Sequence, residues 1–206
     1  MTLAHPDRDR LAAASPSRPA AAVNALADPA LVLLGGLIAV TAHAVPLPAA
    51  IGWTLLAVTF CIALPYAALL LLVRRGRVGD RHIVAREERR LPFAIAFVST
   101  LAGLGILVST GAPRPLVAVV AAGLVAFAAV IVLSTRSKAS VHTGVAAAVV
   151  TALAIEFGPW LLVPGTAVVA VVGWARTRAG RHTAGQVWLG AGVAAAAVLL
   201  VYPAVR

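Results

Sequence analysis

Seven long apolar runs, separated by short charged segments, dominate this chain of 206 residues. Each run is about as long as the roughly 17–25 residues that an α-helix needs to cross a membrane. The runs occupy residues 29–45, 49–73, 92–110, 115–134, 141–157, 160–175 and 186–204. With 61% apolar and 12% charged residues, the composition excludes an ordinary soluble domain. We therefore predict an all-α fold, a polytopic transmembrane helical bundle.

The bundle is expected to form a single domain over residues 28–206, preceded by a disordered N-terminal tail over residues 1–27. The tail is polar, rich in Pro and Ala, and lacks the apolar core of a signal peptide. Asp28-Pro29 predicts the start of the first helix, because Asp is a favoured N-cap and Pro is favoured at the first helical position. The predicted number of spans is six or seven, since the first run can either cross the bilayer or only enter it, and the sixth is short and interrupted by a Pro-Gly pair.

Nearly all the Lys and Arg residues lie on one predicted face of the bundle. With seven spans, the tail and the segments 74–91, 135–140 and 176–185 share that face, and only Arg114 and Arg206 lie opposite. Because cytoplasmic loops are enriched in positive charge, these loops are predicted to be cytoplasmic in a multi-pass protein of the plasma membrane.

The same composition bears on source and partners. A single Lys against many Arg is typical of GC-rich bacterial coding, and the single Cys excludes an internal disulfide and a Cys-based metal site. The basic residues lie in short loops rather than on a soluble, aromatic-rich surface, so no nucleic-acid partner is expected.

Three charged segments on the basic face also contain His. Their candidate residues are His82 and Arg89 in the first segment, Lys138, Ser140 and His142 in the second, and Arg176, His182 and Gln186 in the third. Phosphoryl transfer needs stabilisation of charge on the phosphoryl oxygens, an in-line nucleophile and an acid for the leaving group. Arg and His can meet these needs, whereas the seven Asp and Glu form no paired-carboxylate motif on a span. The sequence therefore predicts a phosphate site without a metal or other cofactor.

In order and spacing, these segments resemble the type 2 phosphatidic acid phosphatase superfamily. That pattern is Lys, six residues, Arg-Pro; then Pro-Ser-Gly-His; then Ser-Arg, five residues, His, three residues, Asp. Here His82 is followed after six residues by Arg89-Arg90, and the second piece reads Ala-Ser-Val-His142. The third reads Ala-Arg, five residues, His182, three residues, Gln186, and the resemblance covers residues from about 75 to 204.

The resemblance implies a role for each candidate residue. His182 would be the nucleophile that forms a phosphohistidine, and His142 the acid that protonates the leaving group. The implied phosphate-binding residues are Arg176, Arg89, Ser140 and His82, which stands at the family's Lys position. Lys138, in the second segment, is a further predicted phosphate-binding residue. Gln186 replaces the family's Asp: its amide oxygen can accept a hydrogen bond from His182 but supplies no negative charge.

The resemblance implies a membrane hydrolase that acts, without metal, on a lipid phosphate or a polyprenyl phosphate or diphosphate held among membrane lipids. Two alternatives stay open. Because Gln186 replaces the Asp, the chain can be a catalytically impaired relative that binds lipid phosphates without hydrolysing them. It can also be a small transporter or scaffold, for which Glu156 is the candidate ionisable residue within a span.

Overall fold

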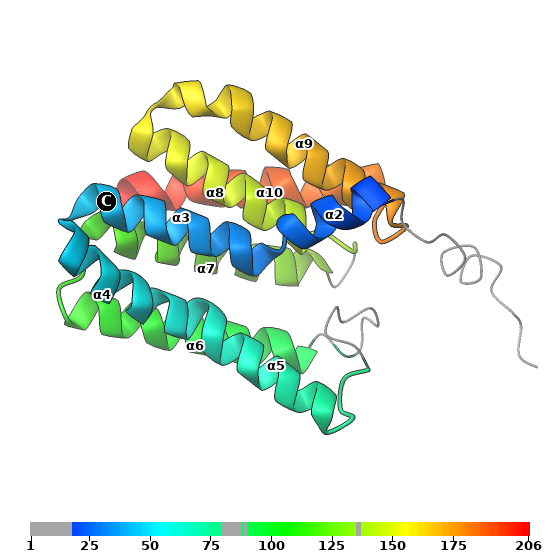
Figure 1. The fold of residues 1–206 in the computed structure, drawn as a ribbon, viewed down its shortest axis with the longest axis horizontal. Helices are drawn as coiled ribbons and strands as arrows, with labels where there is room; N and C mark the ends of the chain where they lie inside the picture. Colours follow the sequence, from blue (N-terminus) through cyan, green and yellow to red (C-terminus); the bar gives the residue numbers. More distant parts are fainter. Residues whose placement is uncertain (1–17, 80–87, 89, 135–136) are drawn as a thin grey trace, which may run out of the picture.

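The protein is a bundle of long α-helices that run side by side (Figure 1). The computed structural model describes residues 18–79, 88, 90–134 and 137–206. Its helical elements are α2 (Arg18–Leu26), α3 (Pro29–Ala44), α4 (Leu47–Val58), η1 (Thr59–Ala63), α5 (Leu64–Arg74), α6 (Arg90–Ser109), α7 (Arg114–Ser134), α8 (Val141–Phe157), η3 (Pro159–Leu161), α9 (Leu162–Arg178) and α10 (Ala184–Val205). No strand occurs in these described ranges, and the predicted all-α fold is confirmed.

Each of the seven predicted spans corresponds to a helical segment whose ends differ by at most a few residues. Within the described residues, five segments are long and apolar enough to cross a membrane, namely 47–74, 90–109, 114–133, 159–178 and 184–205. The helices α2 and α3 pass the same test as a pair bent by 46°, and α8 is shorter, at 17 residues. The chain is therefore a multi-pass helical membrane protein.

The second span contains a π-helical turn, η1, between α4 and α5. In this turn the Leu64 N–H donates to the Thr59 carbonyl, five residues back. Pro65 follows and has no N–H, so it cannot bond the Phe60 carbonyl in the same register. The Ser99 hydroxyl of α6 donates to that carbonyl instead, at 2.7 Å. Because an unsatisfied carbonyl is costly in lipid, this bond fixes α6 against the irregular turn.

The centre of the bundle is formed by α8 and α10, which pack on each other and on α7. The buried side of α8 consists of small residues, Thr143, Gly144, Ala146, Ala147, Val149, Thr151, Ala152 and Ala154. Small side chains allow helix backbones to approach closely in a membrane. Larger apolar side chains, including Leu37, Leu107, Leu116 and Val198, form a core cluster to which α3, α6, α7 and α10 contribute.

The alternating direction of the helices places the charged connections at one end of the bundle. Figure 1 shows the turn between α9 and α10 at the same end as α2, and the C-terminus at the other end. Asp28 caps α3 at this end, where its carboxylate accepts a hydrogen bond from the Ala30 N–H at 2.9 Å, so the predicted start of the first span is confirmed.

The predicted disordered tail is wrong for residues 18–26, which form α2. This Ala-rich segment has the composition of a helix, and Ala20 is fully buried where α2 packs on α9. Residues 1–17 lie outside the described part of the chain.

Candidate functional site

The first turns of α8 and α10 are joined by one backbone hydrogen bond and one side-chain hydrogen bond at the charged end of the bundle. The Ser140 N–H donates to the Gln186 carbonyl at 3.1 Å. The Thr143 hydroxyl lies 3.1 Å from the Val187 carbonyl and 3.2 Å from the Ser140 carbonyl. These bonds hold the two helix starts, and the candidate residues on them, in a fixed relation.

Gly190 makes this close approach sterically possible. A β-carbon at position 190 would lie 2.5 Å from the Ser140 carbonyl oxygen and 3.0 Å from its nitrogen. No side chain fits there unless the helices move apart. Gly190 is thus a structural requirement for the site, although it carries no chemistry itself.

Ser140 caps α8. Its side chain is fully buried, and its hydroxyl oxygen accepts a hydrogen bond from the Thr143 N–H. Ser is a favoured N-cap because it satisfies one of the free N–H groups of the first turn. The phosphate contact expected of Ser140 stays a prediction, and capping is the role that the geometry gives its oxygen.

His182 is oriented by a backbone carbonyl. Its Nδ1 lies 3.0 Å from the carbonyl oxygen of Lys138, whose own side chain is exposed. A carbonyl oxygen can only accept, so a hydrogen bond here requires the proton on Nδ1. The lone pair of the neutral ring then lies on Nε2, the tautomer that a nucleophile needs. Lys138 thus acts through its main chain, and phosphate binding by its ammonium group stays a prediction.

Gln186 belongs to a capping box. The Thr183 side chain accepts a hydrogen bond from the Gln186 N–H, and the Gln186 amide oxygen accepts one from the Thr183 N–H at 3.1 Å. This differs from the expectation that the amide oxygen would face His182. The physical reason is local: a Thr three residues before a Gln favours the reciprocal cap at a helix start.

Arg176 is positioned by α2, a helix that sequence reasoning had missed. One guanidinium nitrogen of Arg176 donates to the Asn24 side-chain oxygen at 3.4 Å. The Asn24 amide group also donates to the Ala175 carbonyl at 3.3 Å. Asn24 therefore bridges the main chain and the side chain at the end of α9, and no spacing motif in the sequence indicated it.

A cavity of about 390 Å³ opens beside these residues. His142, Arg176 and His182 line it together with Asp28. The structure thus brings three predicted site residues, from α8, α9 and the turn before α10, to the wall of one cavity. His82 and Arg89, which were predicted to complete the phosphate site, lie outside the described residues.

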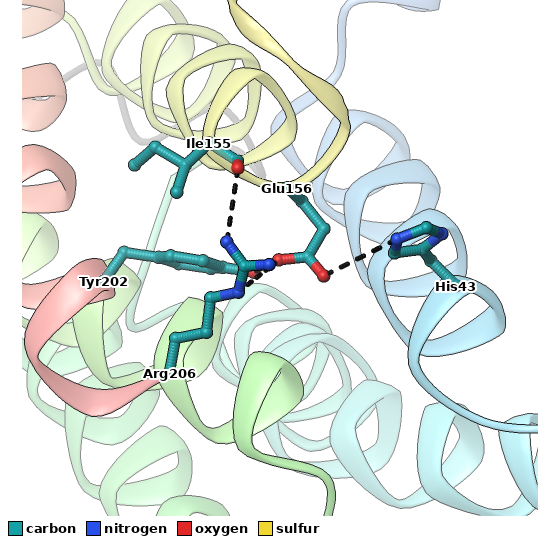
Figure 2. A network of polar contacts seen from close by, with 5 residues as sticks. All are labelled: His43, Ile155, Glu156, Tyr202 and Arg206. Carbon is teal, nitrogen blue, oxygen red and sulfur yellow. Dashed lines mark hydrogen bonds and ion pairs between the residues drawn. The ribbon is translucent and has the colours of Figure 1, made fainter.

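A second polar cluster lies at the opposite end of the bundle, around the buried carboxylate of Glu156 (Figure 2). The Tyr202 hydroxyl donates to Glu156 at 2.8 Å, and Nε of Arg206 lies 3.2 Å from the same carboxylate oxygen. His43 approaches the other oxygen at 4.0 Å, and Arg206 also donates to the Ile155 carbonyl at 3.3 Å. This cluster, here called the Glu156 cluster, connects α3, α8 and α10.

The Glu156 cluster bears on the transporter alternative. Glu156 was the candidate for an ionisable group on a membrane pathway, and it is paired with Arg206 at the end of α8. Its partners were not predictable from spacing, since Tyr202 and His43 lie far from it in sequence. In the described ranges, no group of three or more His, Cys, Asp or Glu side chains is arranged to hold a metal ion.

Comparison of the whole chain with protein-family models, with curated proteins and with solved structures finds no match in any of the three.

Proposed function

We propose that this protein is a metal-independent membrane phosphatase that hydrolyses a lipid-linked phosphate or diphosphate through a phosphohistidine at His182. The observation that carries the proposal is the bond between Nδ1 of His182 and the Lys138 carbonyl, at 3.0 Å beside a cavity that His142 and Arg176 also line. It leaves Nε2 as the nucleophilic atom. The likeness of the His and Arg spacing to the type 2 phosphatidic acid phosphatase superfamily supports the same role.

The proposed reaction has two steps. Nε2 of His182 attacks the phosphorus in line, the bond from phosphorus to the leaving oxygen breaks, and His142 gives that oxygen a proton. A water molecule then attacks the phosphorus of the phosphohistidine and gives a proton to His142. The bond from phosphorus to Nε2 breaks, its electron pair returns to Nε2, and inorganic phosphate leaves. Arg176 stabilises the charge on the phosphoryl oxygens in both steps, a role that a bidentate guanidinium suits.

The test is release of inorganic phosphate from lipid phosphates by the purified protein. His182→Ala removes the nucleophile and should lower the rate by at least about 10³-fold. His43→Ala, which changes a His at the opposite end of the bundle, is the matched control and should keep the activity. Release should survive EDTA, because Arg and His supply the charge. A rate unchanged in His182→Ala, or abolished by EDTA and restored by Mg²⁺, would refute the mechanism.

A second candidate function is binding of lipid phosphates without turnover. It is favoured by the partner of the His182 Nδ1 atom: a main-chain carbonyl stabilises the positive charge that develops on the ring less than a carboxylate in that place would. Binding of a lipid phosphate with no phosphate release and no acid-labile phosphoprotein would favour this function over hydrolysis.

We also propose that the site faces the cytoplasm, on the basis of the Lys and Arg bias in the loops at that end. In a protein with Cys61→Ser, single Cys residues at Ala179 and Ala204 report the two sides. An impermeant thiol reagent added outside intact cells should label position 204 and not position 179. The opposite pattern would invert the orientation and change the leaflet that supplies the substrate.

A further inference from the structure

The cavity beside His182 continues far into the apolar part of the bundle. Its wall passes from the charged end along α3, η1, α5, α6, α7, α8 and α10. The α4–η1–α5 span and α6, joined by the Ser99 bond, form one side, and α3, α7, α8 and α10 form the other. The cavity is therefore lined by two sets of helices, which also contact each other where α3 packs on α4 and α6 packs on α7.

The polarity of the wall changes with depth. Charged and imidazole groups, from Asp28, His142, Arg176 and His182, lie at the charged end. Deeper in, the wall is formed mainly by aliphatic and aromatic side chains such as Leu37, Ile62 and Phe127. An end that carries Arg176 and two imidazoles, followed by an apolar channel, fits a ligand with an anionic head and a hydrocarbon chain.

The depth of the cavity can be measured along α7. Val130 lies near the charged end, since its side chain is 3.7 Å from a β-carbon built at Gly144 in the first turns of α8. The wall continues along α7 to Val119. At about 1.5 Å per residue, Val130 and Val119 are separated by about 16 Å, roughly half of a hydrocarbon core of about 30 Å.

The volume and the depth agree on a single chain. A methylene group is similar in size to a water molecule, which occupies roughly 30 Å³, so the 390 Å³ cavity has room for roughly 13 such groups. An extended chain with C–C bonds of about 1.5 Å advances roughly 1.25 Å per carbon, so roughly 13 carbons also fill the 16 Å depth. Two chains side by side would need about twice the volume.

We propose that this cavity binds the one hydrocarbon chain of a single-chain lipid phosphate, an alkyl or isoprenoid phosphate, with its head at His142, Arg176 and His182. Diacyl phosphates are then poor ligands, because their second chain has no place inside the bundle. This inference rests on the proposed function for the position of the phosphate head. It adds the class of lipid and the part of the protein that selects it.

Gly123 offers a direct way to test the chain site. It lines the cavity on α7, about 10 Å deeper than Val130 by helix rise, and a β-carbon there meets nothing within 4 Å. A Phe side chain at this position would occupy the channel below the first eight or so carbons of the ligand. Gly105 on α6 has equally open surroundings but does not line the cavity, which makes Gly105→Phe the matched control.

The experiment measures binding of alkylphosphonates, whose C–P bond resists hydrolysis, to the full chain in phosphatidylcholine nanodiscs. Gly123→Phe should weaken dodecylphosphonate binding by at least about tenfold and octylphosphonate binding by less than about threefold. Gly105→Phe should leave both within about twofold. Dioleoyl phosphatidic acid should compete at least about tenfold more weakly than dodecylphosphonate. Equal competition by the diacyl lipid, or dodecylphosphonate binding that is absent or unchanged in Gly123→Phe, would overturn the proposal.

A measurement on the unmodified protein covers the case in which Gly123→Phe does not fold. Cys61, the one Cys in the sequence, lines the cavity on η1. Dodecylphosphonate should slow its reaction with a small membrane-permeant thiol reagent at least about fivefold, whereas inorganic phosphate should not. Equal protection by both, or by neither, contradicts chain binding at this depth.

These results separate the chain site from the proposed chemistry. Chain-selective binding without any phosphate release would leave the chain site intact and remove the phosphatase. Conversely, release of phosphate from phosphatidic acid at a rate that Gly123→Phe does not change would keep the phosphatase and remove the chain site.

Discussion

The two ends of this bundle contain similar residue types in opposite arrangements. At the Glu156 cluster, a carboxylate with 3% of its side chain exposed is surrounded by Arg206, Tyr202 and His43, and the groups satisfy one another. At the other end, His142, Arg176 and His182 are arranged around a cavity. The role of a charged group at a helix end therefore depends on its surroundings: the Glu156 cluster joins helices, whereas the other group borders a cavity.

The largest effect on stability is expected when the ion pair of the Glu156 cluster is removed. Arg206→Ala leaves the Glu156 carboxylate buried without its guanidinium partner, and should lower the free energy of unfolding by about 2–3 kcal/mol, since Arg206 is itself partly exposed. Thermal unfolding in a mild detergent, followed by circular dichroism, measures this loss. Arg114→Ala, an exposed Arg at the same end, should change stability by less than about 0.5 kcal/mol.

The double variant Glu156→Gln with Arg206→Ala sharpens the first prediction. Removing the charge together with its partner should restore more than half of the lost stability, because no unpaired charge is left buried. If Arg206→Ala alone is as stable as the parent protein, the Glu156 cluster does not hold α3, α8 and α10 together at this end of the bundle.

Gly190→Ala is the corresponding change at the end of the bundle that contains His142 and His182. The added β-carbon would lie 2.5 Å from the Ser140 carbonyl oxygen, so α8 and α10 must separate, at a cost of about 2 kcal/mol. Separation also disturbs the relation between His142 and His182, and phosphate release should fall with stability. Gly192→Ala on the same helix meets nothing within 4 Å and is the control for both measurements. A stable and fully active Gly190→Ala protein would mean that the site does not depend on this approach.

Much of the fold was predictable because the membrane restricts helix length, so apolar runs give helix positions directly. The helix caps were also predictable from the sequence. Asp28-Pro29 was recognised, and the Thr183-to-Gln186 spacing of a capping box is present, although Gln186 was given another role. Hydrogen bonds to main-chain carbonyls were not predictable. The Lys138 carbonyl that orients His182 has no side-chain signature, and only the folded chain brings positions 138 and 182 together.

Asn24→Ala should have a smaller effect, which is confined to the surroundings of Arg176. Losing the bonds to Arg176 and to the Ala175 carbonyl is expected to cost about 1 kcal/mol, seen as an increase in KM of about fivefold with kcat less affected. The matched control is Leu26→Ala, at a position of α2 that is 76% exposed. A change in kcat with KM constant would argue that Asn24 does not act by positioning Arg176.

Gln186→Ala should have the smallest effect. It removes one half of the capping box, for a loss of about 0.5–1 kcal/mol in stability, and leaves the bond between His182 and the Lys138 carbonyl intact. Phosphate release should stay within about threefold, and Gln186→Glu should retain the cap and match the parent protein. A loss of activity greater than about tenfold with normal unfolding would instead show that the Gln186 amide orients His182.

The shortness of α8 has a consequence for the surrounding bilayer. Its 17 residues extend about 25 Å, less than a typical hydrocarbon thickness of about 30 Å, yet polar side chains lie at both of its ends. Because α8 is shorter than such a core, at least one of its polar ends lies within the hydrocarbon thickness. Water has to enter the protein to reach that end. For the proposed lipid phosphatase, membrane thickness then sets how far a phosphate headgroup must descend to meet His182, so thin bilayers should favour its entry.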